Sequence, residues 1–232
     1  MQDRTAVVIV AAGTSSRMQG RDKLWIPLAG RITLARTIDV FEESPLIDII
    51  VLVLNAERIA DADALREREQ WQKLIAIIPG GPRRQDSVRR GLDVLAGFAS
   101  PPAWVMIHDG ARPLVTPEII AAGLEAGKRY GAATAAVPVK DTIKVVHDGT
   151  VHTTLDRAEL WAIQTPQVFS FSLIHDAHHS AAAQADATDD AALLERLGHT
   201  VAVFPGTYSN IKITTRDDLA LAETLIQQGA RS

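Results

Sequence analysis

Residues 7–23, VVIVAAGTSSRMQGRDK, form an apolar run that breaks into small residues, then hydroxyls, and ends among cations. A β-branched run that stops at Ala-Ala-Gly predicts a buried strand followed by a loop. Small residues at positions 11–13 let backbone N–H groups approach a ligand, and Arg17 and Lys23 can neutralise phosphate charge. Because the stretch matches neither the G-x-G-x-x-G nor the P-loop template, it predicts either an anion-binding loop or a solvated basic turn.

Further short aliphatic runs follow along the chain, and segments with helical spacing separate most of them. Such alternation predicts an α/β fold, with a mostly parallel twisted sheet covered by helices on both faces. Right-handed crossovers place the carboxyl ends of parallel strands at one edge, where ligands bind in such folds. The predicted strands are residues 6–10, 47–54, 74–78, 104–107, 132–137 and 200–204, and the predicted helices are residues 32–41, 56–71, 87–95 and 117–129.

The composition is ordinary for a globular protein, since 47% of the 232 residues are hydrophobic and 22% are charged. A net charge of −4 argues against nucleic acid as a partner, and no run approaches the ~18 apolar residues of a membrane span. The chain has no cysteine, which excludes disulfides, thiol nucleophiles and thiolate metal sites. We expect a cytoplasmic protein with a single domain over residues 1–232, because no long linker appears.

Residues 137–157, VPVKDTIKVVHDGTVHTTLDR, break the alternation of strands and helices. Asp-Gly between alternating residues is a strong hairpin signal. A two-stranded ribbon is marginally stable alone, so one prediction is a projecting arm that packs on a second subunit. The other prediction is an antiparallel edge of the main sheet, and the residues alone favour neither.

A second glycine-rich loop lies in residues 79–92, PGGPRRQDSVRRGL, after another predicted strand. The Gly81 backbone and the Ser87 hydroxyl suit recognition of a base or a sugar edge. Asp86 or Ser87 is expected to cap the helix that follows. Ordinary helix entry is the alternative to a ligand-binding role.

A third loop follows the strand in residues 105–115, VMIHDGARPLV. An acid at the end of a strand, here Asp109, can hold Mg²⁺ or accept hydrogen bonds from hydroxyl groups. Arg112 can bind phosphate, or it can form a structural ion pair with Asp109.

Two later segments contain further polar candidates. Thr165-Pro166-Gln167 is predicted to be an extended loop with a hydroxyl group. Lys212 stands between two isoleucines and is predicted to point away from the core, although a lone lysine on a strand is more often only solvated. Thr214 or Thr215 is expected to cap the final helix.

The segment HDAHHS places His175 and His179 four residues apart on a predicted helix. An H-E-x-x-H motif would need glutamate at position 176, where Asp176 stands, and no third metal ligand is evident. The pattern therefore favours an exposed helix and no metal site. Residues 181–192 are predicted to form a helix-turn-helix segment on the surface.

Taken in order, the motifs resemble the 2-C-methyl-D-erythritol 4-phosphate cytidylyltransferase family. The similar stretches are AAGTSSRM…DK, GGPRRQDSV, HDGARPLV, PVKDTIK, LDRAELWAIQTPQVF and NIKITTRDDLALAE, from residue 7 to residue 223. The resemblance implies a Rossmann-like nucleotidyltransferase fold with a protruding β-arm at about residues 137–157 that exchanges contacts in a homodimer. It also implies an enzyme that uses CTP, methylerythritol phosphate and Mg²⁺ in the non-mevalonate pathway to isoprenoid precursors.

The resemblance assigns roles residue by residue. Arg17, Lys23 and Lys212 match the family's catalytic cations around the triphosphate, whereas Arg21 receives no role. The nucleotide-binding positions are Ala11, Ala12, Gly13, Gly81 and Ser87. The acceptor-binding positions are Asp109, Arg112 and Thr165, with Thr142 and Arg157 of the arm reaching the neighbouring subunit's site.

The chain departs from the family pattern at a few positions. Leu24 follows Lys23 where glutamine is usual, Pro82 follows the paired glycines where an acid is usual, and Ser209 replaces an acid before NIK. A sister family that uses ribitol 5-phosphate is the nearest alternative, but HDGARP resembles the methylerythritol enzymes more than the VRP form of the ribitol enzymes. A nucleotide-binding regulator without turnover is the other alternative, and the retained cations argue against it.

Overall fold

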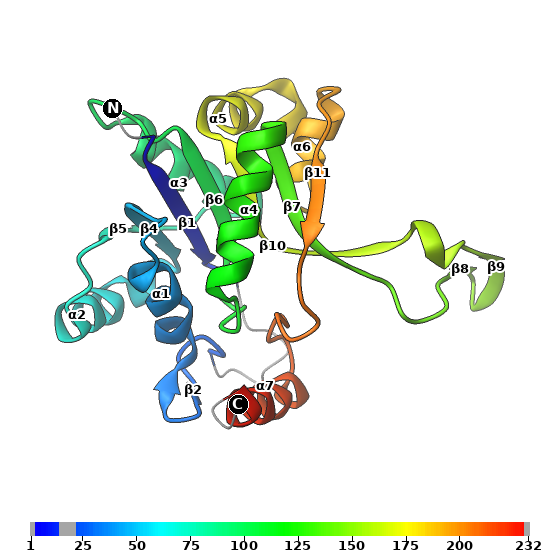
Figure 1. Cartoon of the computed structure of the whole chain (residues 1–232), viewed down its shortest axis with the longest axis horizontal. Coiled ribbons are helices and arrows are strands. Elements are labelled where there is room, and N and C mark those ends of the chain that lie inside the picture. Colours follow the sequence, from blue (N-terminus) through cyan, green and yellow to red (C-terminus); the bar gives the residue numbers. More distant parts are fainter. Residues whose placement is uncertain (1–2, 14–21, 230–232) are drawn as a thin grey trace.

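The computed structural model describes residues 3–13 and 22–229, and a seven-stranded sheet lies at its centre (Figure 1). The strand order is β11-β7-β10-β6-β1-β4-β5, and every pairing except those of β10 is parallel. The strands are β1 Thr5–Ala11, β4 Ile49–Leu54, β5 Leu74–Pro79, β6 Trp104–Asp109, β7 Ala132–Pro138, β10 Trp161–Ser170 and β11 Ala202–Pro205. The predicted α/β class is confirmed, and each predicted strand is present with slightly shifted ends.

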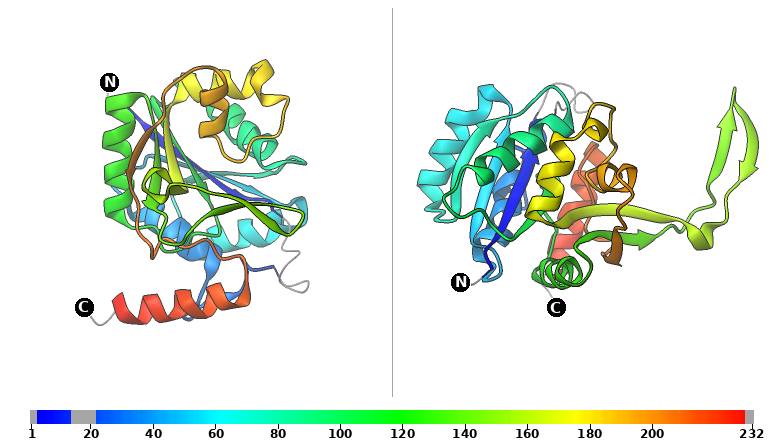
Figure 2. Two further views of the ribbon diagram at one scale, coloured as in Figure 1. Left: turned by 90° about the vertical axis from the view of Figure 1, so that its right-hand side faces the viewer. Right: turned by 90° about the horizontal axis from the view of Figure 1, so that it is seen from above.

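Helices cover both faces of this sheet because successive residues of a strand point to opposite sides. Val7 and Ile9 of β1 belong to one core, whereas Ala6 and Val8 belong to the other. The helices of the first core are α1 Thr33–Glu43, α2 Ile59–Glu69 and α4 Pro117–Tyr130. Those of the second core are α3 Arg84–Ala96, α5 Phe171–His179 and α6 Ala191–Arg196 (Figure 2).

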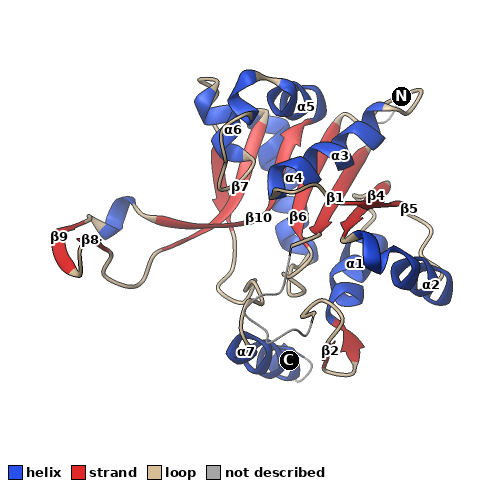
Figure 3. Ribbon diagram, turned by 180° about the vertical axis from the view of Figure 1, so that it is seen from behind, coloured by secondary structure: helices blue, strands red, loops and turns tan. Residues whose placement is uncertain are grey.

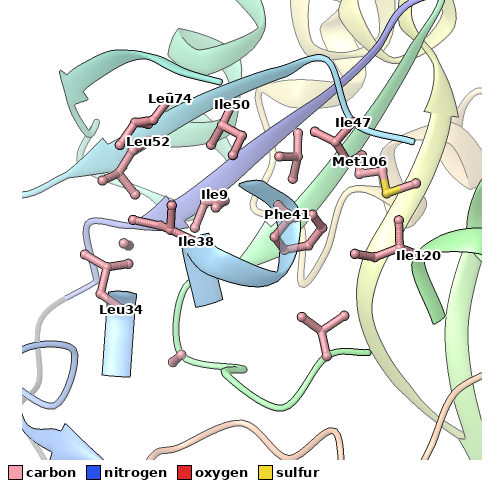
Figure 4. Packing of buried hydrophobic residues seen from close by; sticks show 14 of the residues in the cluster. Ile9, Leu34, Ile38, Phe41, Ile47, Ile50, Leu52, Leu74, Met106 and Ile120 are labelled. Atoms are coloured by element: carbon pink, nitrogen blue, oxygen red, sulfur yellow. The ribbon is translucent and has the colours of Figure 1, made fainter. Parts of the chain in front are cut away.

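The first core shows why the predicted helices form where they do. Ile38 and Phe41 lie on one face of α1 and are fully buried against Ile9 and Met106 of the sheet (Figure 4). Burial of a side chain of this size stabilises the fold by about 1.5–3 kcal/mol. All four predicted helices are present, although residues 56–71 divide into the 3₁₀ turn η2 Ala56–Arg58 and α2.

The prediction of a loop at Thr165-Pro166-Gln167 is wrong, because these residues lie inside β10. This strand runs antiparallel between β6 and β7 in the middle of the sheet. Proline cannot donate to a strand ladder, and the pairing with β7 is interrupted between Ile163 and Gln167, where Pro166 stands. The irregularity lets a central strand contain a residue that normally marks a loop.

The Asp-Gly hairpin is confirmed. It forms a separate two-stranded sheet of β8 Lys144–His147 and β9 Thr150–Thr154. Asp148 and Gly149 both have positive φ, at 50° and 75°, as the turn of such a hairpin requires. The hairpin projects from the body (Figures 1 and 2), so the alternative of an edge on the main sheet is wrong.

Residues 181–192 do not form the predicted surface helix-turn-helix. They contain the 3₁₀ turn η4 Ala181–Ala183, an irregular stretch and the start of α6. The Gln85 amide donates to the Ala183 carbonyl at 2.6 Å, and its oxygen accepts from the Ala187 N–H at 2.8 Å. The segment is therefore anchored to the first turn of α3 and buries Asp190 completely. In the described ranges, 3–13 and 22–229, no helix has the length and apolar character needed to span a membrane.

The chain returns to the sheet edge between β11 and α7 Arg216–Gly229 (Figure 1), and α7 lies beyond the sheet on that side (Figure 3). Ile213 is fully buried in a small core with Leu28 of the short hairpin β2 Pro27–Leu28 and β3 Arg31–Ile32. Its N–H donates to the Ala111 carbonyl at 2.8 Å. Lys212 consequently points away from that core, as predicted, and Thr215 accepts the Asp218 N–H at 3.2 Å as the expected helix cap.

Candidate active site

The loops that follow β1, β5 and β6 meet at the carboxyl edge of the sheet, because these strands are parallel. With the segment before α7 they surround a pocket of about 370 Å³. The predicted site residues that line it are Ala11, Ala12, Gly13, Lys23, Gly81, Ser87, Asp109 and Lys212. Arg17 lies outside the described residues, as does Arg21, to which no role was assigned.

The first two loops touch each other at Gly80. A methyl group at this position would collide with the Ala12 Cβ and lie 2.8 Å from the Ser87 Oγ. The Gly81 N–H donates to the same Ser87 oxygen at 3.0 Å. Ser87 thus holds the second loop in shape as well as lining the pocket.

The second loop enters α3 differently from the prediction. The helix begins at Arg84, so Asp86 and Ser87 lie in its first turn and neither is the cap. The Asp86 carboxylate accepts from the Arg83 N–H at 3.3 Å, as in a capping box, and from the Arg83 guanidinium at 2.8 Å. Arg83 also pairs with Asp186 at 3.1 Å, which attaches the loop to the segment that covers it.

Asp109 is the acidic centre of the site. Its Oδ2 lies 2.7 Å from the Lys212 Nζ, and its Oδ1 lies 3.3 Å from the Arg84 Nε. Burial would raise the pKa of this carboxyl, but the cations of Arg84 and Lys212 outweigh burial and hold that pKa well below its usual range. In the described part of the chain its ion pairs are with these two cations, so the alternative in which Arg112 forms an ion pair with Asp109 is wrong.

Arg84 is a site residue that the sequence analysis missed. Its guanidinium bridges Asp109 and Asp190, with Nη1 2.7 Å from the Asp190 Oδ2. Asp190 is fully buried, and the His178 Nε2 lies 3.1 Å from its other oxygen. The sequence shows Arg84 only as the second of two adjacent arginines before a predicted helix. Its partner Asp190 stands 106 residues away, so no local pattern indicates the pair.

A chain of hydrogen bonds connects Asp109 to the core. The Thr165 hydroxyl oxygen accepts the Asp109 N–H at 3.0 Å and lies 3.2 Å from the His108 Nδ1. The His108 Nε2 lies 3.1 Å from the Arg112 carbonyl, which can only accept. His108 is therefore the neutral tautomer with its proton on Nε2, and Nδ1 accepts the Thr165 hydroxyl proton.

This arrangement predicts a loss of stability in mild acid. Burial lowers the pKa of His108 to about 4. Between pH 6.5 and 4, His108 is therefore protonated in the unfolded chain but stays neutral in the folded chain. Stability is therefore present above the unfolded pKa and falls as the pH drops, by a free energy on the order of 3 kcal/mol from this group. Urea unfolding across this range measures it, and the His108→Gln variant should show a flatter profile. Equal slopes would contradict the assignment.

A second cleft of about 260 Å³ adjoins the first, and Arg84, Asp109 and Lys212 line both. The predicted acceptor residues Arg112 and Thr165 line the second cleft as well. Arg112 donates to the Asn210 carbonyl at 2.7 Å, while its buried Nε has no hydrogen-bond partner in the described residues. The structure therefore brings together two clefts that share a charged wall.

The two arm residues among the predicted site positions lie elsewhere in the chain's own structure. Thr142 and Arg157 are exposed, and neither lines either cleft. The Arg157 guanidinium donates to the Lys140 carbonyl at 2.6 Å, at the base of the arm. In the structure of one chain, neither of these two residues therefore reaches the clefts.

Comparison with known proteins identifies relatives over nearly the whole chain. The family model described as 2-C-methyl-D-erythritol 4-phosphate cytidylyltransferase (IspD) matches residues 5–228. A protein of that name from Dehalococcoides mccartyi strain CBDB1 is 47% identical over 230 residues, which cover 99% of each chain. Another from Alkaliphilus oremlandii is 46% identical and covers 97% of this chain and 95% of the relative.

Solved structures give the same result. The 4-diphosphocytidyl-2C-methyl-D-erythritol synthase of Anaerococcus prevotii superposes with a TM-score of 0.84 at 30% identity, covering 97% of this chain and 99% of that one. The 2-C-methyl-D-erythritol 4-phosphate cytidylyltransferase of Thermus thermophilus gives 0.75 at 31% identity, covering 95% and 98%. The chain therefore belongs to the 2-C-methyl-D-erythritol 4-phosphate cytidylyltransferase family.

Proposed function

We infer that this chain transfers the cytidylyl group of CTP to 2-C-methyl-D-erythritol 4-phosphate in isoprenoid precursor synthesis. The products are 4-diphosphocytidyl-2-C-methyl-D-erythritol and pyrophosphate. Family membership supports the activity, and the structural observation that carries it is the wall of Arg84, Asp109 and Lys212 between two adjoining clefts. Two substrates bound on either side of this wall would meet at the α-phosphorus of CTP.

The reaction that suits this arrangement is an in-line displacement. An oxygen of the acceptor phosphate forms a bond to the α-phosphorus while the bond to the β-phosphate oxygen breaks, and pyrophosphate leaves with that electron pair. The acceptor phosphate is already an anion at neutral pH, so the step depends on positioning and charge stabilisation rather than on a general base. We propose that Lys23 and Lys212, together with Arg17, stabilise the charge on the transferring phosphate.

Recognition of the two substrates divides between the clefts. We propose that positions 11–13, Gly81 and Ser87 hold the nucleotide, because all of them line the larger pocket. Arg112 and Thr165 would hold the acceptor, since both line the smaller cleft and the buried Arg112 Nε has no partner in the described residues.

Mg²⁺ is the proposed cofactor, and the residues present fit it. Mg²⁺ in nucleotide enzymes is held by one or two carboxylates together with substrate phosphates and water. Asp109 is the one carboxylate among the described residues that line the larger pocket, so it is the protein group that would hold such an ion, beside its contacts with Arg84 and Lys212. When bound, Mg²⁺ would neutralise phosphate charge.

Release of pyrophosphate tests the proposed function. The chain with CTP and Mg²⁺ should release pyrophosphate with 2-C-methyl-D-erythritol 4-phosphate and not with ribitol 5-phosphate. A preference for ribitol 5-phosphate would move the chain to the sister activity. Binding of CTP without pyrophosphate release from either acceptor would identify a regulator and contradict the proposal.

We also propose that the chain works as a homodimer through its arm, in which residues 137–157 lie mostly exposed. Val146 and Val151 are each 52% exposed on the hairpin, and Ile143 is 37% exposed. A two-stranded ribbon with apolar side chains in water is stabilised when another surface covers it. Thr142 and Arg157 would then reach the partner's acceptor site.

A cytoplasmic location stays a prediction from composition.

Mixing two inactive variants tests the arm. Asp109→Asn damages the core of the site and Arg157→Ala damages the arm, so each variant alone should have little activity. Half of the dimers in an equimolar exchanged mixture pair the two variants, and each contains one intact site, so about a quarter of the unchanged activity should return. The matched control replaces the Arg157→Ala chain by one with both substitutions, which cannot supply an intact core. A mixture no more active than its components would contradict a shared site.

A further inference from the structure

A cluster of two histidines and one aspartate lies outside the clefts, between α3 and α5. Asp93 is near the end of α3, and His175 and His179 lie four residues apart on α5. The His179 Nε2 is 2.7 Å from the Asp93 Oδ1, and the His175 Nε2 is 3.5 Å from the same oxygen. The potential ligand atoms of the three residues all lie within 4.8 Å of one another.

We propose that Asp93, His175 and His179 form a binding site for a divalent zinc ion that joins α3 to α5. Asp93 supplies the third ligand that the HDAHHS pattern by itself lacked. Two imidazole nitrogens and one carboxylate oxygen are a donor set that Zn²⁺ accepts, with water in the fourth position. Mg²⁺ prefers an all-oxygen shell, so this site would select a different metal from the Mg²⁺ that we propose for CTP.

Two of the three ligand separations agree with a small adjustment around an ion, and the third, between nitrogens of the two histidines, is at most 4.8 Å. Tetrahedral ligands about 2.1 Å from zinc lie about 3.4 Å from one another. The separation of 3.5 Å between His175 and Asp93 already meets this requirement, and that of 2.7 Å for His179 must open by under an ångström. The side chains of His179 and Asp93 are 46% and 45% exposed, so they have room to rotate and water has access.

The surroundings hold the ligands on rigid elements. The His175 ring stacks on Phe171 at 5.5 Å between centroids and lies 4.6 Å from the His179 ring. His178, on the buried side of α5, contacts Asp190 and takes no part. The helix thus separates its histidines into one that serves the core and two that face Asp93.

We expect the bound ion to cross-link α3 and α5, which cover the same face of the sheet. The two helices pack against each other. The first residue of α3 is Arg84, which follows the second glycine-rich loop. An ion bound to the folded chain and not to the unfolded one raises stability by mass action. Because none of the three ligands lines either cleft, the inference does not depend on the proposed reaction.

Calorimetric titration of the metal-free full chain with Zn²⁺, in excess Mg²⁺, tests the site. We expect one tightly bound Zn²⁺ per chain and a higher thermal midpoint in its presence. His179→Ala and Asp93→Asn should each weaken binding by more than about 10-fold, because loss of even an outer-shell partner of a metal ligand costs 10–100-fold. Replacement of Zn²⁺ by Co²⁺ should give the intense visible absorption of a tetrahedral ion.

The arm supplies the critical control. His147 and His152 are stacked at 4.9 Å across the hairpin and form a second pair of histidines able to bind metal. The double variant His147→Ala/His152→Ala should keep the Zn²⁺ site, as should His199→Ala at an exposed position. Circular dichroism and melting in EDTA establish that the Asp93 and His179 variants fold. Zinc binding that survives His179→Ala and Asp93→Asn, or that is lost with the arm pair, would overturn the proposal, as would absence of binding to the unchanged chain.

Discussion

Replacement of Lys23 by alanine is expected to lower kcat by about 100-fold or more, as loss of a donor that stabilises transition-state charge does. Lys23 and Lys212 both line the larger pocket. Asp109 is the one carboxylate among the described residues that line it. The charge that develops on the transferring phosphate is therefore expected to rely on a small number of cations. Arg17→Ala is expected to have the same effect, as a prediction from the sequence. Steady-state pyrophosphate release measures both.

Lys128→Ala is the matched control, because Lys128 is an exposed lysine on α4 that lines neither cleft. Its turnover should equal that of the unchanged chain. Lys23→Arg should recover part of the activity, since it keeps the charge but changes the geometry of the donor. Near-normal turnover in Lys23→Ala would remove this residue from the mechanism, whatever the outcome for the acceptor assay.

Replacement of Arg84 by methionine is expected to destabilise the fold by a free energy on the order of 3 kcal/mol, because it leaves buried carboxylates without their cation. Asp190 is the main reason, since it is fully buried and its carboxylate would keep only His178 as a partner among the described residues. Asp109 would keep Lys212 but lose the contact that places it between the clefts. Urea unfolding measures the stability, and activity should fall as well.

Arg89→Met on the same helix is the control for Arg84. Its guanidinium is 42% exposed and lies 3.7 Å from Asp86, so the expected change is within about 0.5 kcal/mol. The double variant Arg84→Met/Asp190→Asn should lose less free energy of unfolding than the two single variants lose together, because it removes both members of a buried pair. Additive effects would show that Arg84 and Asp190 are not coupled.

Much of the site could be anticipated from local patterns. Three segments were each predicted from a pattern within about ten residues: the strand before Gly13, the second glycine-rich loop and the strand that ends at Asp109. All three meet at one edge of the sheet. Lys212 was placed by its two flanking isoleucines, because alternation in an extended segment puts neighbours on opposite sides. The Asp-Gly turn likewise predicted the hairpin from its own residues.

Contacts between distant segments could not be anticipated. Residues 165–167 were expected to form a loop around Pro166, yet they lie in the central strand β10 because β6 and β7 supply its partners on either side. Arg84 finds Asp190 only because residues 181–192 fold back over the start of α3. Asp93 completes the histidine pair for the same reason, since α3 and α5 share one sheet face.

The sequence by itself therefore determined the class of fold, the loops at the carboxyl edge and the family, because periodicity, turn residues and motif order are properties of neighbouring residues. Only the tertiary structure decided which strand lies between β6 and β7 and which cations Asp109 pairs with, whereas it confirmed the projecting hairpin that the family resemblance implied. Those outcomes depend on which distant groups can bury apolar surface and satisfy charge together. Such partners carry no mark in the local sequence.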